Sequence, residues 1–227
     1  MISENADAEL LLTLNSYVGS HTLFDKILFV FANNDLIRGF PIFFCLVALW
    51  FSGDSKGRRS RMLVGLLATC LATFLSVWLQ YHFTPHIRPL LDPALHLHIP
   101  DVRGTEHWDR LGSFPSDTAT LYFSLATVVF LENRLAGSLG FFWALASVGV
   151  TRVAHGWHYP SDVVGALVLG PGCVYLFNKI PHFGTLFERT LSLFETRMFI
   201  VHAFYFLLLA DAYTLFGSLQ GIFRLLK

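Results

Sequence analysis

Three residues with complementary chemistry stand at fixed spacing in the second half of the chain: Arg152, His158 and Asp162. An arginine can clamp a phosphate group through two of its N–H groups. A histidine can attack phosphorus, and an aspartate can hold the imidazole ring in the reactive tautomer. The Arg-x5-His-x3-Asp spacing therefore predicts a phosphoryl-transfer site in which these three residues are catalytic.

Two other segments carry residues that could bind the phosphate of a substrate. The triplet Pro-Ser-Asp occurs at residues 115–117 and again at residues 160–162, and each copy precedes an apolar block. Pro and Ser at such places signal a helix start, and a helix N-terminus binds phosphate through its free N–H groups. With the Arg88-Pro89 pair of the preceding polar stretch, the predicted phosphate-binding residues are Arg88, Ser116, Asp117, Thr118 and Arg152.

The composition places these residues in a membrane protein. Of the 227 residues, 54% are hydrophobic and 14% are charged, whereas about a quarter of a soluble domain is charged. Because the apolar residues form long blocks, we expect an all-α fold, a polytopic transmembrane helix bundle. The 16 basic and 16 acidic residues balance, which argues against a nucleic-acid partner and leaves lipids as the expected partners.

We expect six or seven spans. The apolar blocks that could cross a bilayer are residues 36–52, 62–83, 118–131, 139–153, 163–180 and 199–219. Residues 10–31 contain polar side chains that are costly at mid-bilayer, so this stretch is either one tilted span or an interfacial helix. The expected division is an N-terminal helix (1–35), a catalytic membrane bundle (36–180) and a C-terminal membrane segment (181–227).

The orientation follows from basic residues in a short connection. Residues 53–61 contain four basic side chains and one acidic one, and the positive-inside rule places them in the cytoplasm. Counting spans from there puts residues 84–115 and the Arg152–Asp162 string on the extracytoplasmic face. A polar connection as long as 84–115 is usually functional, so the active site is expected on that face.

The chain resembles the type 2 phosphatidic acid phosphatase superfamily, the integral-membrane lipid phosphatases, over residues 36–180. The family motif Ser-Arg-x5-His-x3-Asp is matched by Arg152, His158 and Asp162, with Thr151 in place of the serine. The resemblance implies metal-independent dephosphorylation or phosphotransfer on a lipid (pyro)phosphate, with a polyprenyl lipid favoured. It also implies a phosphohistidine intermediate at His158 and no cofactor.

The other two family motifs are half matched. Lys-x6-Arg-Pro is represented by Arg88 and its following proline, with Tyr81 where the lysine belongs. In the motif Pro-Ser-Gly-His, Ser116 is present, whereas Asp117 replaces the glycine and Thr118 replaces the histidine. The family histidine protonates the leaving oxygen, and a threonine hydroxyl is far too weak an acid for that role.

Four explanations of Thr118 stay open. The leaving group could need no protonation, as when a phosphate leaves a pyrophosphate. Another histidine could supply the proton, and the candidates are His82, His86, His107 and His155. The chain could be a catalytically degenerate binder or transporter of phosphorylated lipid, which is the alternative to an enzyme. Finally, the threonine could be an engineered substitution that traps substrate.

Other candidate sites are weaker. Cys45, Cys70 and Cys173 lie apart inside apolar blocks and predict neither a disulfide nor a metal site. His96 and His98 alternate, but a metal site needs further ligands, so no metal is expected. A membrane protease is disfavoured because the Gly-x-Ser-x-Gly and His-Glu-x-x-His signatures are missing from the sequence. Nothing in the sequence indicates an oligomeric state.

Overall fold

The computed structural model describes residues 4–20, 22–53, 56–82, 87–98 and 112–215, and their regular secondary structure is entirely helical. The elements in chain order are α1 (Glu4–Asn15), α2 (Thr22–Asn33), α3 (Asp35–Phe51), α4 (Lys56–His82), η1 (Pro89–Leu91), η2 (Pro93–Leu95), α5 (Asp117–Glu132), α6 (Arg134–Ala144), the π-helical turn η4 (Leu145–Gly149), α7 (Val150–Ala154), α8 (Pro160–Lys179), α9 (Pro181–Leu193), η5 (Glu195–Arg197) and α10 (Met198–Tyr213).

Three helical segments are long and apolar enough to cross a membrane: α4, the continuous run Arg134–Ala154 from α6 to α7, and α8. The count rises to five if two bent pairs each form one span, namely α2 with α3 (bent by 55°) and α9 with α10 (bent by 67°). The predicted helical membrane bundle is confirmed. The predicted number of six or seven spans is not reached by length and composition in the described residues, partly because α5 has only 16 residues.

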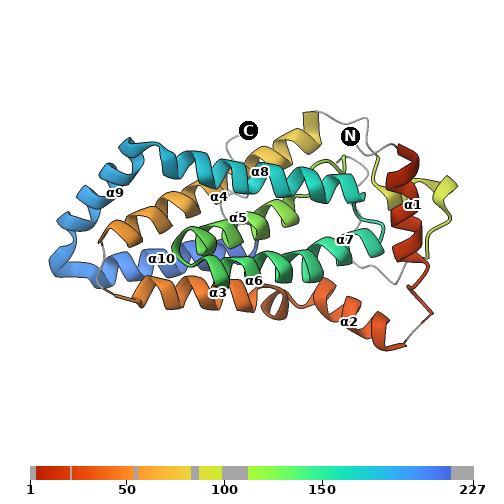
Figure 1. The fold of residues 1–227 in the computed structure, drawn as a ribbon, viewed down its shortest axis with the longest axis horizontal. Helices are drawn as coiled ribbons and strands as arrows, with labels where there is room; N and C mark the ends of the chain where they lie inside the picture. The colour runs from red at the N-terminus through yellow and green to blue at the C-terminus, as the bar shows by residue number, and fades with distance from the viewer. Residues whose placement is uncertain (1–3, 21, 54–55, 83–86, 99–111, 216–227) are drawn as a thin grey trace, which may run out of the picture.

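Helix α5 is the centre of the bundle and packs against α4, α6 and α8 (Figure 1). From Thr118 to Val129 its residues are buried without interruption, as expected for a helix that is enclosed on all sides. Gly170 of α8 permits one of these contacts, because a Cβ atom there would lie 2.7 Å from the backbone oxygen of Thr120. The residues at the start of α5 are therefore fixed in position by the helices that pack around them.

Local sequence explains where the helices of the bundle begin. The side chain of Ser116 accepts a hydrogen bond from the N–H of Ala119 and so caps α5. Asn133 alone separates α5 from α6, and its side chain caps α6. Helix α8 begins at Pro160, whose fixed φ suits the first turn. Both Pro-Ser-Asp triplets thus stand at helix starts, as predicted.

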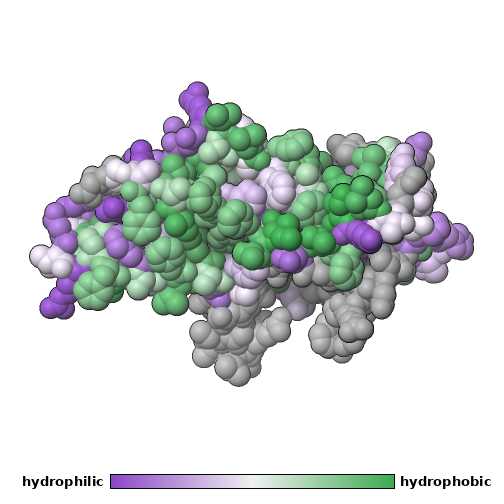
Figure 2. Space-filling model, turned by 90° about the horizontal axis from the view of Figure 1, so that it is seen from below, coloured by the Kyte–Doolittle hydropathy of each residue, from purple (hydrophilic) through white to green (hydrophobic). Residues whose placement is uncertain are grey.

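The bundle has an apolar middle and two different ends. Figure 2 shows one long face, on which hydrophobic side chains cover most of the middle and hydrophilic ones gather toward the ends. At the α9 end, Glu132 pairs with Arg61 at 2.8 Å and with Arg58 at 3.5 Å. At the other end, α1 lies across the bundle, beside the end of α7 and the start of α8 (Figure 1).

The N-terminal stretch whose course was open, residues 10–31, is divided between two helices. Helix α1 ends at Asn15 and α2 begins at Thr22. Gly19 lies between them with φ of 82°, a conformation that glycine adopts without strain. This stretch is therefore not one continuous helix.

Candidate active site

His158 lies in the loop of residues 155–159 between α7 and α8, which we call the catalytic loop after its predicted role. Its side chain is buried, and its Nδ1 atom lies 2.8 Å from the carbonyl oxygen of Ser113. A carbonyl oxygen only accepts hydrogen bonds, so Nδ1 carries the proton. The Nε2 atom therefore carries the lone pair and faces Arg88, whose Nη1 lies 3.3 Å away.

Asp162, in the first turn of α8, was predicted to hold the His158 ring. Its Oδ2 atom lies 3.4 Å from Nδ1 of His158, which is longer than an ordinary hydrogen bond. The same oxygen accepts a hydrogen bond from the backbone N–H of Tyr159 at 2.7 Å. Asp162 therefore closes the turn that carries His158 and places a negative charge beside the ring, while Ser113 is the nearer acceptor.

Arg88 reaches the same loop from the polar connection after α4. Its Nη1 atom lies 3.3 Å from the carbonyl oxygen of Trp157, and its Nη2 atom lies 3.4 Å from Oε1 of Gln80. The N–H of Leu90 donates to the carbonyl oxygen of Gly156 at 2.8 Å. The structure thus brings Arg88 and His158 together, although 70 positions separate them in the chain.

Arg152 approaches Trp157 from α7. Its guanidinium carbon lies 4.5 Å from the centre of the Trp157 ring, a cation–π contact. Its Nη2 atom donates to Oγ1 of Thr118 at 2.9 Å. Thr118 therefore anchors an arginine, and Arg88 and Arg152 both contact Trp157, one through its backbone oxygen and the other through its ring.

The predicted phosphate-binding helix starts already have partners within the protein. The backbone N–H of Ser116 donates to the carbonyl oxygen of Asp162 at 3.2 Å. Asp117 accepts a hydrogen bond from the N–H of Thr118 at 2.8 Å. At α8, the N–H of Ser161 donates to Oδ1 of Asp7 at 2.9 Å. A role of Ser116, Asp117 and Thr118 in binding phosphate stays a prediction.

Burial decides the charge state of His158. It lowers the pKa of the imidazole below its ordinary value, the nearby carboxylate of Asp162 acts in the opposite direction, and the positive charge of Arg88 lowers the pKa further. Burial also lowers the pKa of Arg88, against the attraction of Asp117 and Asp162, but a guanidinium stays protonated in proteins. At neutral pH the site thus contains a neutral imidazole beside a positively charged arginine.

Two of the four candidate proton donors are in the described part of the chain. His155 is buried, its Nδ1 atom lies 2.8 Å from the carbonyl oxygen of Thr151, and its ring centre lies 4.9 Å from that of Trp157. His82 is exposed and stacks on Trp78. Residues 86 and 107 lie outside the described residues.

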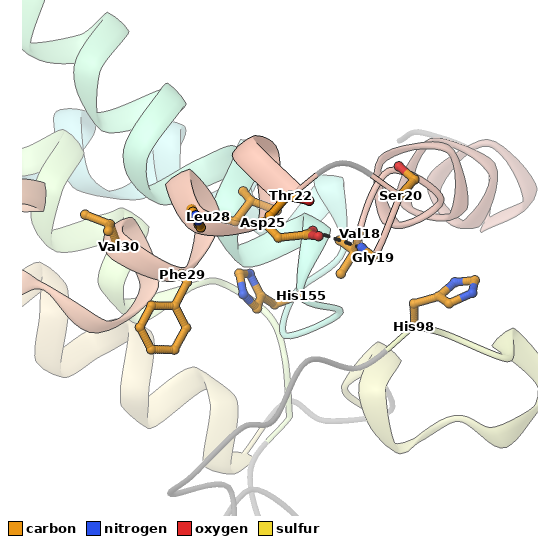
Figure 3. A pocket seen from close by; sticks show the side chains of 11 residues that line it. Val18, Gly19, Ser20, Thr22, Asp25, Leu28, Phe29, Val30, His98 and His155 are labelled. Carbon is orange, nitrogen blue, oxygen red and sulfur yellow. Dashed lines mark hydrogen bonds between the residues drawn. The ribbon is translucent and has the colours of Figure 1, made fainter.

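A cavity of about 820 Å³ adjoins the catalytic loop. Figure 3 shows Phe29 of α2 next to His155 in this view, with His98 farther away on the opposite side; Leu28 of α2 also lines the cavity. The lining is largely apolar, with Asp25 bonded to the N–H of Gly19. His155 therefore faces a mainly hydrophobic space.

Sequence reasoning missed Gln80 and Ser113. Gln80 is 1% exposed, and its Nε2 atom donates to the carbonyl oxygen of Pro115 at 2.7 Å, so it joins Arg88 to the start of α5. Tyr81, at the position of the family lysine, is 53% exposed. Neighbouring helix residues point in different directions, and a buried glutamine at the end of an apolar block was the available signal. Ser113 contributes a backbone oxygen, which leaves no signal in the sequence.

Metal-binding potential is limited in the part of the chain that the structure describes. There, no group of three or more His, Cys, Asp or Glu side chains is arranged to hold a metal ion. Cys45, Cys70 and Cys173 are free thiols.

Comparison with known sequences assigns the chain to a family. The sequence model of the PAP2 superfamily matches residues 61–185, more than half of the chain. The chain belongs to the PAP2 superfamily. The match contains Arg88, Thr118, Arg152 and His158, so the resemblance predicted from the motifs is confirmed.

Two curated relatives are similar to this PAP2 protein. "Bacitracin transport permease protein BcrC" of Bacillus licheniformis is 34% identical over 98 residues, 43% of this chain and 47% of the relative. "Undecaprenyl-diphosphatase BcrC" of Bacillus subtilis (strain 168) is 25% identical over 138 residues, 59% of this chain and 64% of the relative. The chain thus spans less than two thirds of either relative. No solved structure matches it.

Proposed function

We propose that this chain is a metal-independent phosphatase of lipid pyrophosphates, with a polyprenyl pyrophosphate as substrate. The observation that carries the proposal is the arrangement of His158, whose Nδ1–H is held by Ser113 while Nε2 faces Arg88 at 3.3 Å. A nucleophile with its tautomer fixed and a cation beside its reactive atom suits attack on a phosphate. The name of the Bacillus subtilis relative, an undecaprenyl-diphosphatase, supports the substrate class.

The reaction has two steps. Nε2 of His158 attacks the terminal phosphorus, the bond from that phosphorus to the bridging oxygen breaks, and its electron pair leaves with the lipid monophosphate. Arg88 turns from Nε2 to the oxygens of the transferred group, and Arg152, which contacts the ring of Trp157, binds them as well. Water then attacks the phosphohistidine, releasing inorganic phosphate and a proton and restoring the neutral imidazole. Two arginines supply the positive charge that Mg²⁺ supplies in many phosphotransferases.

Thr118 is consistent with a pyrophosphate substrate. A lipid monophosphate leaves as a stable anion, so its departure needs little protonation, whereas the alkoxide from a monophosphate ester needs a general acid. In this structure Thr118 accepts a hydrogen bond from Arg152. The residue at this position therefore orients the phosphate-binding arginine instead of donating a proton.

We also propose six spans with the site on the extracytoplasmic side. Helix α5 is enclosed by α4, α6 and α8, and its 16 residues cover about 24 Å at 1.5 Å per residue, so it crosses beside them. Together with the two bent pairs this gives six crossings. The basic residues at the start of α4 lie at the end opposite the catalytic loop, and the positive-inside rule places that end in the cytoplasm.

The test is release of inorganic phosphate by the purified chain in detergent or nanodiscs. Farnesyl and undecaprenyl pyrophosphate are compared with the matching monophosphates, with and without EDTA. We expect turnover of the pyrophosphates, unchanged by EDTA, and none by His158→Ala. Turnover that EDTA abolishes and Mg²⁺ restores would refute the metal-independent mechanism.

A non-catalytic binder or transporter of phosphorylated lipid is the second candidate. It is favoured by the histidine missing from position 118 and by the contact of Arg88 with Nε2, which engages the lone pair of the nucleophile. This alternative would be established if the chain binds lipid pyrophosphate, loses affinity when Arg88 or Arg152 is substituted, and never cleaves the lipid.

A further inference from the structure

Helix α1 lies outside the segment that matches the family, residues 61–185, yet one of its faces contacts the catalytic loop region. Asp7, Leu11 and Asn15 follow one another at intervals of four residues, so they share one face of α1. Their exposed fractions are 5%, 0% and 2%. Two buried polar side chains on a helix of 12 residues indicate specific partners.

Asn15 uses its whole amide group. Its Nδ2 donates to the carbonyl oxygen of Ala154 at 2.8 Å and to that of His98 at 2.9 Å. Its Oδ1 accepts the backbone N–H of His98 at 2.8 Å. Ala154 is the last residue of α7, and His98 belongs to the polar connection that carries Arg88. Asn15 therefore joins the two segments that meet at the nucleophile.

Asp7 makes the second attachment, one residue beyond the start of α8. Its Oδ1 accepts the N–H of Ser161 at 2.9 Å, and its Oδ2 accepts the Ser161 hydroxyl. A carboxylate at a helix N-terminus is stabilised by the free N–H groups and by the helix dipole. The two attachments of α1 thus lie on either side of the catalytic loop, at Ala154 and at Ser161.

We propose that α1 is a splint that fixes the separation of the two ends of the catalytic loop, which makes Asp7 and Asn15 positioning residues of the reaction. The proposal rests on the proposed function of His158. Nε2 of His158 has to meet phosphorus in line with the leaving oxygen, and a misplacement of about 1 Å can cost about 100-fold in rate. Releasing either attachment should therefore slow the chemical step while the arginines still bind the phosphate.

The experiment uses isosteric and truncated variants of the full chain. Asn15→Asp keeps the shape but sets acceptor oxygens against the carbonyls of Ala154 and His98. Asp7→Ala removes both acceptors, whereas Asp7→Asn keeps an acceptor for the N–H of Ser161. Thr13→Ala and Glu9→Ala change exposed positions of the same helix and are the matched controls.

Three quantities are measured for each variant: Tm, steady-state kinetics on farnesyl pyrophosphate, and deuterium uptake of the peptide that contains residues 154–162. For Asn15→Asp and Asp7→Ala we expect kcat to fall about 10- to 100-fold with KM within about twofold of the wild type. Deuterium uptake of the loop peptide should rise in both. Asp7→Asn and the two controls should stay within about threefold of wild-type kcat.

Normal kcat and normal loop protection in Asn15→Asp would overturn the splint. An equal loss of kcat in Asp7→Ala and Asp7→Asn at unchanged Tm would also overturn it, because the acceptor that Asp7→Asn retains for the N–H of Ser161 would then have no effect. If Asn15→Asp fails to fold, the two Asp7 variants decide by the same criteria. Absence of turnover in the wild type would reject the proposed function. The deuterium uptake of the loop peptide in the variants would then still show whether α1 fixes the loop.

Discussion

His158 and Ser113 are joined by the hydrogen bond that sets the tautomer of the imidazole: Nδ1 lies 2.8 Å from the Ser113 carbonyl oxygen and 3.4 Å from Oδ2 of Asp162. The carbonyl stays in place when Asp162 is changed. In the serine protease triad, by contrast, loss of the aspartate costs about 10⁴-fold because the tautomer is wrong. The division of labour between Ser113 and Asp162 can therefore be measured.

We expect Asp162→Asn to lower kcat by about 10- to 100-fold, well short of the loss seen when the tautomer inverts. The asparagine oxygen can still accept the N–H of Tyr159, so the turn is kept, and only the negative charge is removed. Kinetics on a lipid pyrophosphate give kcat, and equilibrium binding of the same lipid to the variant should be unchanged. A loss as large as that of His158→Ala would show that Asp162, and not Ser113, sets the tautomer.

The pH dependence follows from the burial of His158. Burial lowers its pKa below the ordinary 6.5, with Asp162 acting in the opposite direction. Only the neutral imidazole attacks, so kcat/KM should fall with acidification only below pH 6.5 and should be level up to about pH 8. Asp162→Asn removes a charge that raises the pKa, and the acid limb should move to lower pH. An acid limb above pH 6.5 in the wild type would contradict this account.

Position 118 should control the choice between pyrophosphate and monophosphate lipids. General acids contribute about 10²- to 10⁴-fold, so the wild type should prefer pyrophosphates by a factor of that order. Thr118→His should narrow the preference by raising monophosphate turnover. If threonine was introduced by engineering, the histidine should instead raise the turnover of every substrate. His155→Gln tests the buried one of the two candidate donors in the described region and should lower monophosphate turnover selectively if His155 is the acid.

Thr118→Val is the matched control for that series. It keeps the shape of threonine and removes the oxygen that accepts from Arg152. We expect KM for the pyrophosphate to rise, while the preference for pyrophosphate over monophosphate lipids stays nearly unchanged. A preference that collapses in Thr118→Val would assign the hydroxyl a role in the chemistry itself.

Gly156 should be sensitive to substitution because of its backbone. Its φ of 68° is in the left-handed region, and a Cβ atom there would lie 2.5 Å from Cδ1 of Leu97. Gly156→Ala should lower the free energy of unfolding by at least about 1–2 kcal/mol and should loosen the bond from Leu90 to the Gly156 carbonyl. Thermal unfolding in detergent measures the first effect, and an unchanged Tm would argue against a strained loop.

The sequence predicted those parts of the molecule that depend on local signals. Apolar blocks predicted the helices, and the two Pro-Ser-Asp triplets predicted the starts of α5 and α8. The Arg-x5-His-x3-Asp spacing and the Arg88-Pro89 pair indicated residues that the structure does bring together: Arg88 and Arg152 both contact Trp157, and Asp162 lies 3.4 Å from His158. The spacing of residues within one motif indicates which side chains lie close together, because one helical turn or one short loop fixes their separation.

Contacts between distant segments could not be predicted in the same way. The Ser113 carbonyl belongs to the backbone, so any residue type would provide it. Asp7 and Asn15 are polar residues near the start of the chain, and their partners lie 154 and 139 positions away. The count of six or seven spans stays a prediction, because α5, which covers the span expected at residues 118–131, is a helix of only 16 residues.

The most direct test of the central claim is to look for the covalent bond. The wild type and His158→Ala are mixed with farnesyl pyrophosphate labelled with ³²P at the terminal phosphate, and the reaction is quenched with alkali within the first turnover. The proposed mechanism predicts label on the wild-type protein that is stable to alkali, labile to acid and located in the peptide that contains His158, with none on His158→Ala. Phosphate release by the wild type without any protein-bound label, or label that persists in His158→Ala, would contradict it.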